Sequence, residues 1–158
     1  MVILAIDQST AGTKAIIFAA DGSVVARSDV AHRQITSDQG WVEHDPLEIW
    51  QATLKACRQT LALSGIEPAQ VAALAISNQR ETAVCWDRAT GEPVHNAIVW
   101  QCGRAAEIVA RLAKAGAAPL VRQKTGLHLS PFFSAAKMAW ILENVPAASD
   151  LQKNGQLC

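Results

Sequence analysis

The sequence predicts an α/β fold, and three features lead to this prediction. Short apolar runs rich in Val, Ile and Ala open the chain and recur after residue 70. Between them lies a segment whose apolar residues are spaced by three and four, as on one face of a helix. Strands that alternate with helices are typical of domains in which helices cover a sheet. A chain of 158 residues is also long enough to bury a core of its own.

The start of the chain predicts three strands, because apolar runs cover residues 2–6, 15–19 and 24–31. Asp21 and Gly22 separate the second run from the third. An Asp-Gly pair between two apolar runs is typical of a tight β-hairpin. We therefore expect the second and third strands to pair.

A long helix is predicted to begin after Asp45. Asp45 can cap it, Pro46 suits its first position, and Glu48 completes a capping-box pattern. Gly65 is expected to end it. The apolar residues of the helix predict one buried stripe, which consists of Leu47, Trp50, Leu54, Cys57 and Leu61.

The rest of the chain predicts shorter elements. We expect strands at residues 71–77, 82–86 and 97–99, and helices at 104–114 and 134–144. The apolar run at 71–76 predicts a buried strand. Residues 147–158 are polar and without periodicity, so we expect them to fray. These features predict one domain over residues 1–146, followed by the start of a continuation over 147–158.

Composition and charge argue against several classes of partner. The formal net charge is +0 and no basic run occurs, which disfavours nucleic acid or an anionic membrane surface. The opening apolar run is too short for a signal peptide, and no run approaches the ~20 residues of a membrane span. We therefore expect a cytoplasmic protein. Neither the four cysteines nor the four histidines have the spacing of metal ligands.

Arg80 and Glu81 stand side by side, just after the apolar run 71–76. Arg offers five fixed hydrogen-bond donors, and an ionised Glu offers only acceptors. Together they can bind vicinal hydroxyl groups, which need both, so the pair predicts a site for a small polyol or sugar. The alternative is a surface ion pair at a strand end, worth about 0–1 kcal/mol.

A polar turn follows the first strand and indicates a second site, for phosphate. Its small residues, such as Ala11 and Gly12, let backbone N–H groups approach an anion. Hydroxyl donors and one cation accompany them, namely Thr10, Thr13 and Lys14. Asp7, at the end of the strand, can hold hydrated Mg²⁺, which favours one or two carboxylates plus phosphate oxygens. The glycine spacing differs from that of the GxxxxGK[ST] loop, and an ordinary hairpin turn is the alternative.

Taken in order, five segments resemble the amino-terminal part of the FGGY family of carbohydrate kinases, in its glycerol-kinase branch. They are Asp7-Gln8-Ser9-Thr10, Gly40-Trp41-Val42-Glu43-His44-Asp45-Pro46, Ile76-Ser77-Asn78-Gln79-Arg80-Glu81-Thr82, Asn96-Ala97-Ile98-Val99-Trp100-Gln101-Cys102, and Thr125-Gly126-Leu127 followed by Pro131-Phe132-Phe133-Ser134. The resemblance implies an actin-like, ribonuclease-H-like ATPase domain, to which the expected order of strands and helices is similar.

The resemblance also implies roles for individual residues. Arg80 and Glu81 would bind the polyol hydroxyls, while Trp100 and Phe132 would line the polyol site. Asp7 would position Mg²⁺, and four turn residues would contact ATP phosphates: Thr10, Ala11, Gly12 and Lys14. The implied partners are a small polyol, such as glycerol, and ATP, and the complete protein is expected to be a homo-oligomer.

Three departures from the family pattern bear on function. Phe132 stands where the family usually has a Tyr that contacts substrate, which removes one hydrogen bond worth roughly 0.5–1.5 kcal/mol. Gly103 stands where an Arg is frequent, and Lys14 replaces an Arg and lacks its bidentate fork. The family's catalytic Asp is expected beyond Cys158, so we expect the 158-residue chain alone to be inactive.

Alternatives from other classes stay open. The chain can be a non-catalytic fragment or a ligand-binding module, and the substrate can be another short polyol or sugar. A ribonuclease-H-like nuclease shares the opening strands, but it needs several convergent carboxylates for two metal ions. Only Asp7 lies at the end of an expected core strand.

Overall fold

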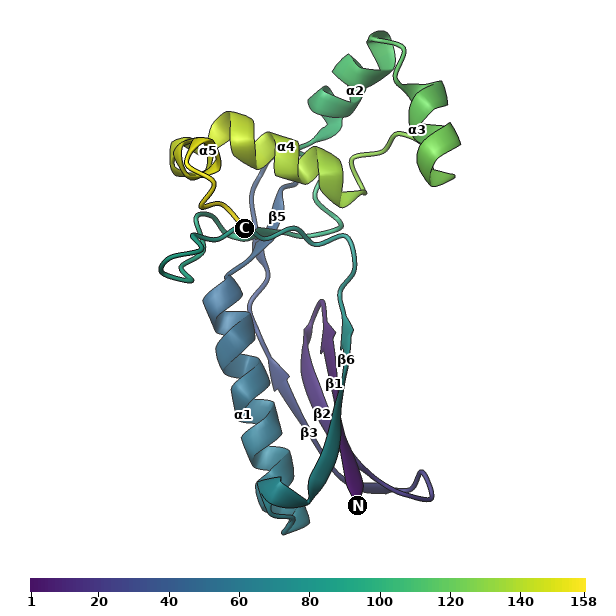
Figure 1. Cartoon of the computed structure of the whole chain (residues 1–158), viewed down its shortest axis with the longest axis vertical. Coiled ribbons are helices and arrows are strands. Elements are labelled where there is room, and N and C mark those ends of the chain that lie inside the picture. The colour runs from purple at the N-terminus through teal and green to yellow at the C-terminus, as the bar shows by residue number, and fades with distance from the viewer. The chain divides into compact units, whose positions relative to one another are not determined.

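A computed structural model describes the whole chain, residues 1–158. The chain forms two compact units, each made of two segments (Figure 1). The first unit contains Met1–Gln34 and Asp45–Gln79, and the second contains Ile35–His44 and Arg80–Cys158. No helix combines the length and the apolar character that crossing a membrane requires.

The first unit is a four-stranded sheet covered by one long helix (Figure 1). β1 (Val2–Ser9), β2 (Gly12–Ala19) and β3 (Val24–Ala31) are antiparallel neighbours, which confirms the three expected strands. β6 (Val71–Asn78) pairs with β1 in parallel, after a short 3₁₀ turn, so the sheet order is β3-β2-β1-β6.

The helix α1 (Pro46–Ser64) begins and ends where the sequence predicts. The carboxylate of Asp45 accepts hydrogen bonds from the backbone N–H groups of Leu47 and Glu48, at 2.8 and 3.4 Å. Gly65 ends the helix with φ 65°, in the left-handed region that glycine adopts without strain. The expected capping box is absent because the carboxylate of Glu48 instead binds Arg33.

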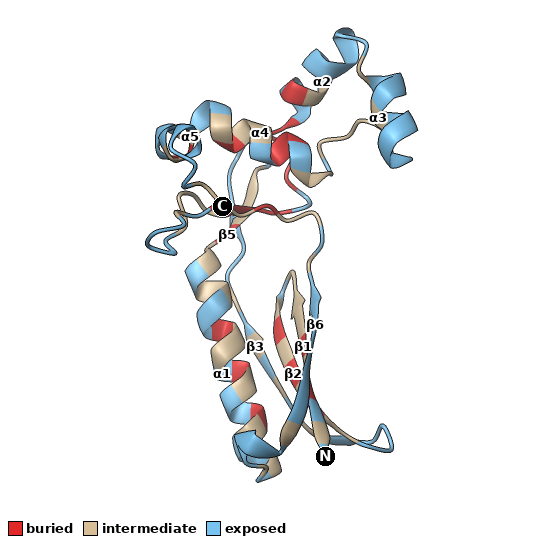
Figure 2. Cartoon of the chain, viewed as in Figure 1, coloured by how far each residue is buried: buried red, intermediate tan, exposed pale blue.

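The buried face of α1 matches the predicted stripe only in part. Cys57 and Leu61 of the stripe pack against the core of the first unit, whereas Leu47 and Trp50 are 48% and 55% exposed. The buried residues of the helix are Ala52, Ala56 and Thr60. Small residues let the helix backbone lie close to β2 and β3, and the hydroxyl of Thr60 donates to the carbonyl of Ala15 in β2 at 3.0 Å. The face of α1 that packs on the sheet is therefore the one whose small residues let the helix approach closely, and not the one with the largest side chains (Figure 2).

The strand β6 is an edge strand, and the prediction that it is buried is wrong. Leu74 and Ile76 are 57% and 67% exposed, although their partners in β1, Leu4 and Ile6, are buried. Leu74 and Ile76 are exposed because α1 packs mainly on β2 and β3, so no helix covers the face of β6 (Figure 2).

The second unit combines a small sheet with four helices. β4 (Ile35–Thr36), β5 (Val42–His44) and β7 (Ala97–Ile98) form the sheet. The helices are α2 (Ala106–Lys114), α3 (Ala118–Thr125), α4 (Ser134–Asn144) and α5 (Pro146–Lys153). The main core of this unit contains Cys85, Ile98, Cys102, Ile141 and Ala148.

Two expectations for this unit are wrong. Residues 82–86 form no strand, because their backbone makes single bridges to different partners, such as Ala83 to Ile98 and Trp86 to Pro93. The terminal segment does not fray: it forms α5, and Trp86 and Cys158 exchange two backbone hydrogen bonds of 2.9 Å. The boundary between the expected domain, 1–146, and its continuation stays a prediction.

Candidate functional site

Glu81 has the least ordinary backbone of the chain. Its φ is 64°, and it is the one residue other than glycine with a positive φ. Such a conformation costs roughly 1–2 kcal/mol and persists only when surrounding contacts hold it. The holding contacts come from Ser134, the first residue of α4, whose backbone N–H and hydroxyl both donate to Glu81 Oε2 at 3.2 Å.

These contacts place the carboxylate at the N-terminal end of α4, where the helix dipole favours a negative charge. Oε2 is engaged by Ser134, and Oε1 accepts no hydrogen bond. An ionised carboxylate offers about four acceptor positions, so Glu81 retains acceptors for a ligand. Arg80 is exposed and takes part in no ion pair, so the interpretation of Arg80 and Glu81 as a surface ion pair is wrong.

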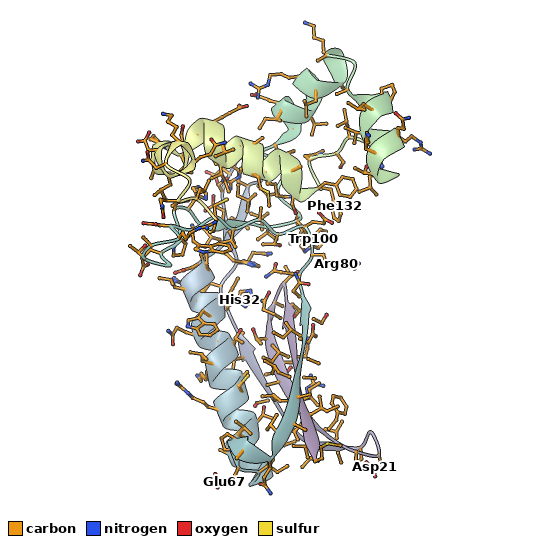
Figure 3. All side chains as sticks on the ribbon, in the orientation of Figure 1. Asp21, His32, Glu67, Arg80, Trp100 and Phe132 are labelled. Carbon is orange, nitrogen blue, oxygen red and sulfur yellow. The ribbon has the colours of Figure 1, made fainter.

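Two aromatic side chains lie next to this carboxylate segment. Trp100 and Phe132 meet edge to face with ring centroids 6.1 Å apart, and they are 36% and 42% exposed. The backbone N–H of Trp100 donates to the hydroxyl of Thr82, the residue after Glu81, at 3.3 Å. Figure 3 labels Arg80, Trp100 and Phe132 in this region of the second unit. The structure thus brings together Glu81, Trp100 and Phe132, three of the four residues predicted to bind a polyol. The fourth, Arg80, directly precedes Glu81 in the chain.

The turn predicted to bind phosphate belongs to the first unit. Asp7 and Lys14 lie directly opposite each other on β1 and β2, and Lys14 Nζ donates to Asp7 Oδ2 at 2.9 Å. The hydroxyl of Ser9 donates to the carbonyl of Gly12 at 2.9 Å and closes the turn. A surface pocket of about 160 Å³ borders the turn and is lined by Ser9, Ala11, Gly12, Thr13, Lys14, Asp29, Val30 and Ala31.

Two residues of this turn have structural duties that the sequence did not indicate. Gly12 lies so close to β3 that an added Cβ would sit 2.6 Å from the carbonyl oxygen of Val30, so strand pairing alone requires glycine there. Thr13 is fully buried and its hydroxyl shares a hydrogen bond of 3.2 Å with Thr53 of α1. Thr13 therefore faces the helix, and its expected role as a phosphate donor is wrong. Thr10, Ala11 and Lys14 remain on the surface side of the turn.

Sequence reasoning assigned no role to Ser134 and Lys137, which complete the surroundings of Glu81. Lys137 lies in the first turn of α4 and is fully buried, and its Nζ donates to the carbonyl of Phe132. The available signal was a lone lysine among apolar residues in Ala135–Trp140. Charged residues are almost never buried without a partner, so that lysine marks a place where a charge is used.

The fold, a sheet covered by a long helix with a polar turn after its first strand, is one that carbohydrate kinases share, and a comparison with protein families identifies the family. The chain matches the N-terminal domain of the FGGY family of carbohydrate kinases over residues 2–153, and it belongs to that family. Curated relatives include glycerol kinase 1 of Thermotoga maritima, 50% identical over 99% of this chain and 32% of that protein. The glycerol kinase of Symbiobacterium thermophilum is 50% identical over 98% of this chain and 31% of that protein.

Solved structures show the same likeness. A crystal structure of Plasmodium falciparum glycerol kinase with ADP matches 99% of this chain with a TM-score of 0.89 and 32% identity. A xylulose kinase from Lactobacillus acidophilus, solved with ligand bound, matches 90% of this chain with a TM-score of 0.80 and 26% identity. The chain spans about a third of the length of the relatives it matches, 31–32% in the curated ones named here.

Proposed function

We propose that this chain supplies the polyol-binding part of an ATP-dependent kinase that converts glycerol to glycerol 3-phosphate. The observation that carries the proposal is the arrangement at Glu81. Its strained backbone holds a carboxylate that has free acceptor positions, near the half-exposed rings of Trp100 and Phe132. Arg80, which forms no ion pair, precedes it in the chain. Hydroxyl groups need donors and acceptors, and a short carbon chain needs an apolar wall, so this arrangement suits a small polyol. Relatives named glycerol kinase, 50% identical to the chain, support glycerol as that polyol.

In this proposal Arg80 donates to the polyol oxygens and Glu81 accepts from their hydroxyl groups. Trp100 and Phe132 pack against the carbon backbone and exclude water from one side of it. Phosphoryl transfer depends mainly on positioning and on charge stabilisation, so holding the reacting hydroxyl still is the contribution that these residues make. A base to take the hydroxyl proton is expected outside residues 1–158.

The proposed ATP-phosphate and Mg²⁺ contacts lie in the turn of the first unit. A single carboxylate suits Mg²⁺, because Mg²⁺ takes one or two carboxylates and fills its other positions with water and phosphate oxygens. Asp7 fits that requirement, since its side chain is 44% exposed and one oxygen lies outside the ion pair with Lys14. Bound Mg²⁺ would neutralise phosphate charge, and Lys14 and the N–H groups of Thr10 and Ala11 would add donors to the same phosphates.

The test compares two exposed arginines of the second unit. In the complete kinase, Arg80→Ala is expected to raise KM for glycerol by about tenfold or more while KM for ATP changes less than about twofold, because a lost charged hydrogen bond is worth roughly 1.5–3 kcal/mol. Arg88→Ala, in the turn after Trp86, serves as the control and is expected to change neither constant. Equal effects of Arg80→Ala on both substrates would contradict a polyol role for Arg80.

Calorimetry of the 158-residue chain addresses the alternative of a binding module. The proposal predicts that the chain binds glycerol through its second unit or ATP phosphates through its first, weakly in each case. It also predicts that the chain catalyses no transfer, because the base that takes the hydroxyl proton is expected outside residues 1–158. If the chain binds neither glycerol nor ATP, only its family membership would support the proposed kinase function. A panel of other short polyols, run in the same way, identifies the preferred substrate.

A further inference from the structure

Lys137 occupies a position that elementary electrostatics disfavours. It is fully buried, and burial of an ammonium group without full compensation is costly. It also lies in the first turn of α4, where the helix dipole repels a cation. Methionine or leucine would fill the same space without either penalty, so packing does not account for lysine at this place.

The contacts of Lys137 connect it to Phe132, a residue of the candidate polyol site. Its Nζ donates to the carbonyl of Phe132 and lies 5.8 Å from the centroid of the Phe132 ring. Burial lowers the pKa of Lys137, and the nearby charge of Glu81 opposes that effect by favouring the ammonium form. The first turn of α4 therefore holds both halves of the site: Ser134 binds the Glu81 carboxylate, and Lys137 binds the backbone that carries the aromatic ring.

We propose that Lys137 is a positioning residue of the polyol site: its buried ammonium fixes the Phe132 carbonyl through a charge-assisted hydrogen bond, which sets the ring against Trp100, close to the Glu81 carboxylate that Ser134 holds at the start of α4. Lys137 is not exposed, so it acts through Phe132 rather than by touching the ligand. The choice of a polyol as the ligand rests on the proposed function; the positioning of the two side chains does not.

The experiment uses three variants of the 158-residue chain. Lys137→Met keeps a long unbranched side chain but removes both the donor and the charge. Lys137→Gln removes the charge and keeps an N–H donor. Ile141→Val is the matched control, because Ile141 is fully buried one turn further along α4 and its shortening weakens packing without touching the site.

Two-dimensional NMR of the ligand-free chain gives the first readout. Lys137→Met is expected to shift the indole N–H signal of Trp100 and the amide signals of Phe132 and Glu81. Lys137→Gln is expected to restore the Trp100 and Phe132 signals, since it rebuilds the hydrogen bond. Ile141→Val is expected to leave all of them in place although it lowers stability.

Glycerol titration of the same samples gives the second readout. Relative to the unmodified chain, we expect glycerol to bind about tenfold more weakly to Lys137→Met and about threefold more weakly to Lys137→Gln, with the control within about twofold. If Lys137→Met keeps the signals and affinity of Ile141→Val, the proposal is wrong and Lys137 only fills space. If Lys137→Met does not fold, Lys137→Gln decides: wild-type affinity in that variant overturns the role of the charge.

The two proposals fail in different ways. A chain whose signals never respond to glycerol contradicts glycerol binding by this chain, whereas the ligand-free spectra still show whether Lys137 sets the positions of Trp100 and Phe132. A chain that binds glycerol equally well with lysine or methionine at position 137 contradicts only the positioning role.

Discussion

Phe132 is the residue at which this chain departs most clearly from the expected polyol contacts. Its ring packs on Trp100 and is 42% exposed, so a hydroxyl added at the ring edge has room to reach solvent or ligand. We predict that Phe132→Tyr improves glycerol use by about two- to tenfold in kcat/KM, since one net hydrogen bond is worth roughly 0.5–1.5 kcal/mol. Phe133→Tyr is the matched control. No gain, or a gain with another polyol only, would point away from glycerol as the native substrate.

The carboxyl group of Glu43 makes the stability of the second unit depend on pH. Burial alone would raise the pKa of its carboxyl, but hydrogen bonds from Asn96 and Arg104, with the charge of Arg104, outweigh burial and hold the pKa below its usual value. Arg104 in turn is buried between Trp41 and Trp140, with its guanidinium carbon 4.3 and 4.6 Å from the ring centroids. Removing one partner of such a pair costs about 3–5 kcal/mol.

Because the folded-state pKa of Glu43 is lowered, its stabilisation is fully present above the unfolded value, near 4.3, and is lost as the pH falls through the folded value. We predict that Glu43→Gln lowers the free energy of unfolding by several kcal/mol at pH 7, and that its difference from wild type shrinks as the pH falls from about 4.5 to 3. Denaturant titrations at each pH measure this. Glu92→Gln, at an exposed position, controls for charge alone, and parallel pH curves for Glu43→Gln and wild type would contradict the prediction.

At the residue scale, the sequence indicated which side chains to examine but not what holds them. The structure pairs Asp7 with Lys14 and Trp100 with Phe132, and their roles in binding stay predictions. Ser134 and Lys137 were not predicted, because their roles depend on contacts formed only in the folded chain. Ser134 binds Glu81 and Lys137 binds the carbonyl of Phe132. Periodicity along the sequence does not indicate such contacts.

Element boundaries followed from local chemistry, and α1 is the clearest case. A capping aspartate, a proline at the first position and a terminal glycine located both of its ends. Its buried face was predicted only in part, because hydrophobicity alone ranks Leu47 and Trp50 above Ala52 and Ala56. The distance between helix and sheet decides which residues are buried, and that distance is a tertiary property.

The N-cap of α1 provides a test at the scale of one element. Asp45 accepts two backbone hydrogen bonds, so we predict that Asp45→Ala lowers the free energy of unfolding of the first unit by about 1 kcal/mol, within 0.5–2 kcal/mol. Asp45→Asn keeps the side-chain acceptor, so we expect it to lower the free energy of unfolding by only a few tenths of a kcal/mol. Urea denaturation followed by circular dichroism measures both, and an equal loss in the two variants would show that charge rather than capping matters.

At the scale of the whole molecule, the two units divide the proposed roles. The first carries the turn proposed for phosphate and Mg²⁺, and the second carries the side chains proposed for the polyol. The family and the order of its elements could be recognised from sequence because its motifs are local and ordered. The exposure of β6 could not be predicted from sequence, because an apolar run predicts a buried strand whether or not a helix covers it.

That exposure has a consequence for solution behaviour. β6 presents Leu74 and Ile76 next to a row of unpaired backbone groups, and apolar edge strands promote association between chains. The opposite edge, β3, carries Arg27 and Asp29, and such charges protect an edge strand. We therefore predict that the 158-residue chain self-associates with rising concentration and that Ile76→Lys shifts it toward monomer. Val25→Lys on β3 is the matched control, expected to have a smaller effect. Sedimentation at several concentrations decides, and a wild-type chain that stays monomeric throughout would show that the β6 edge does not drive association.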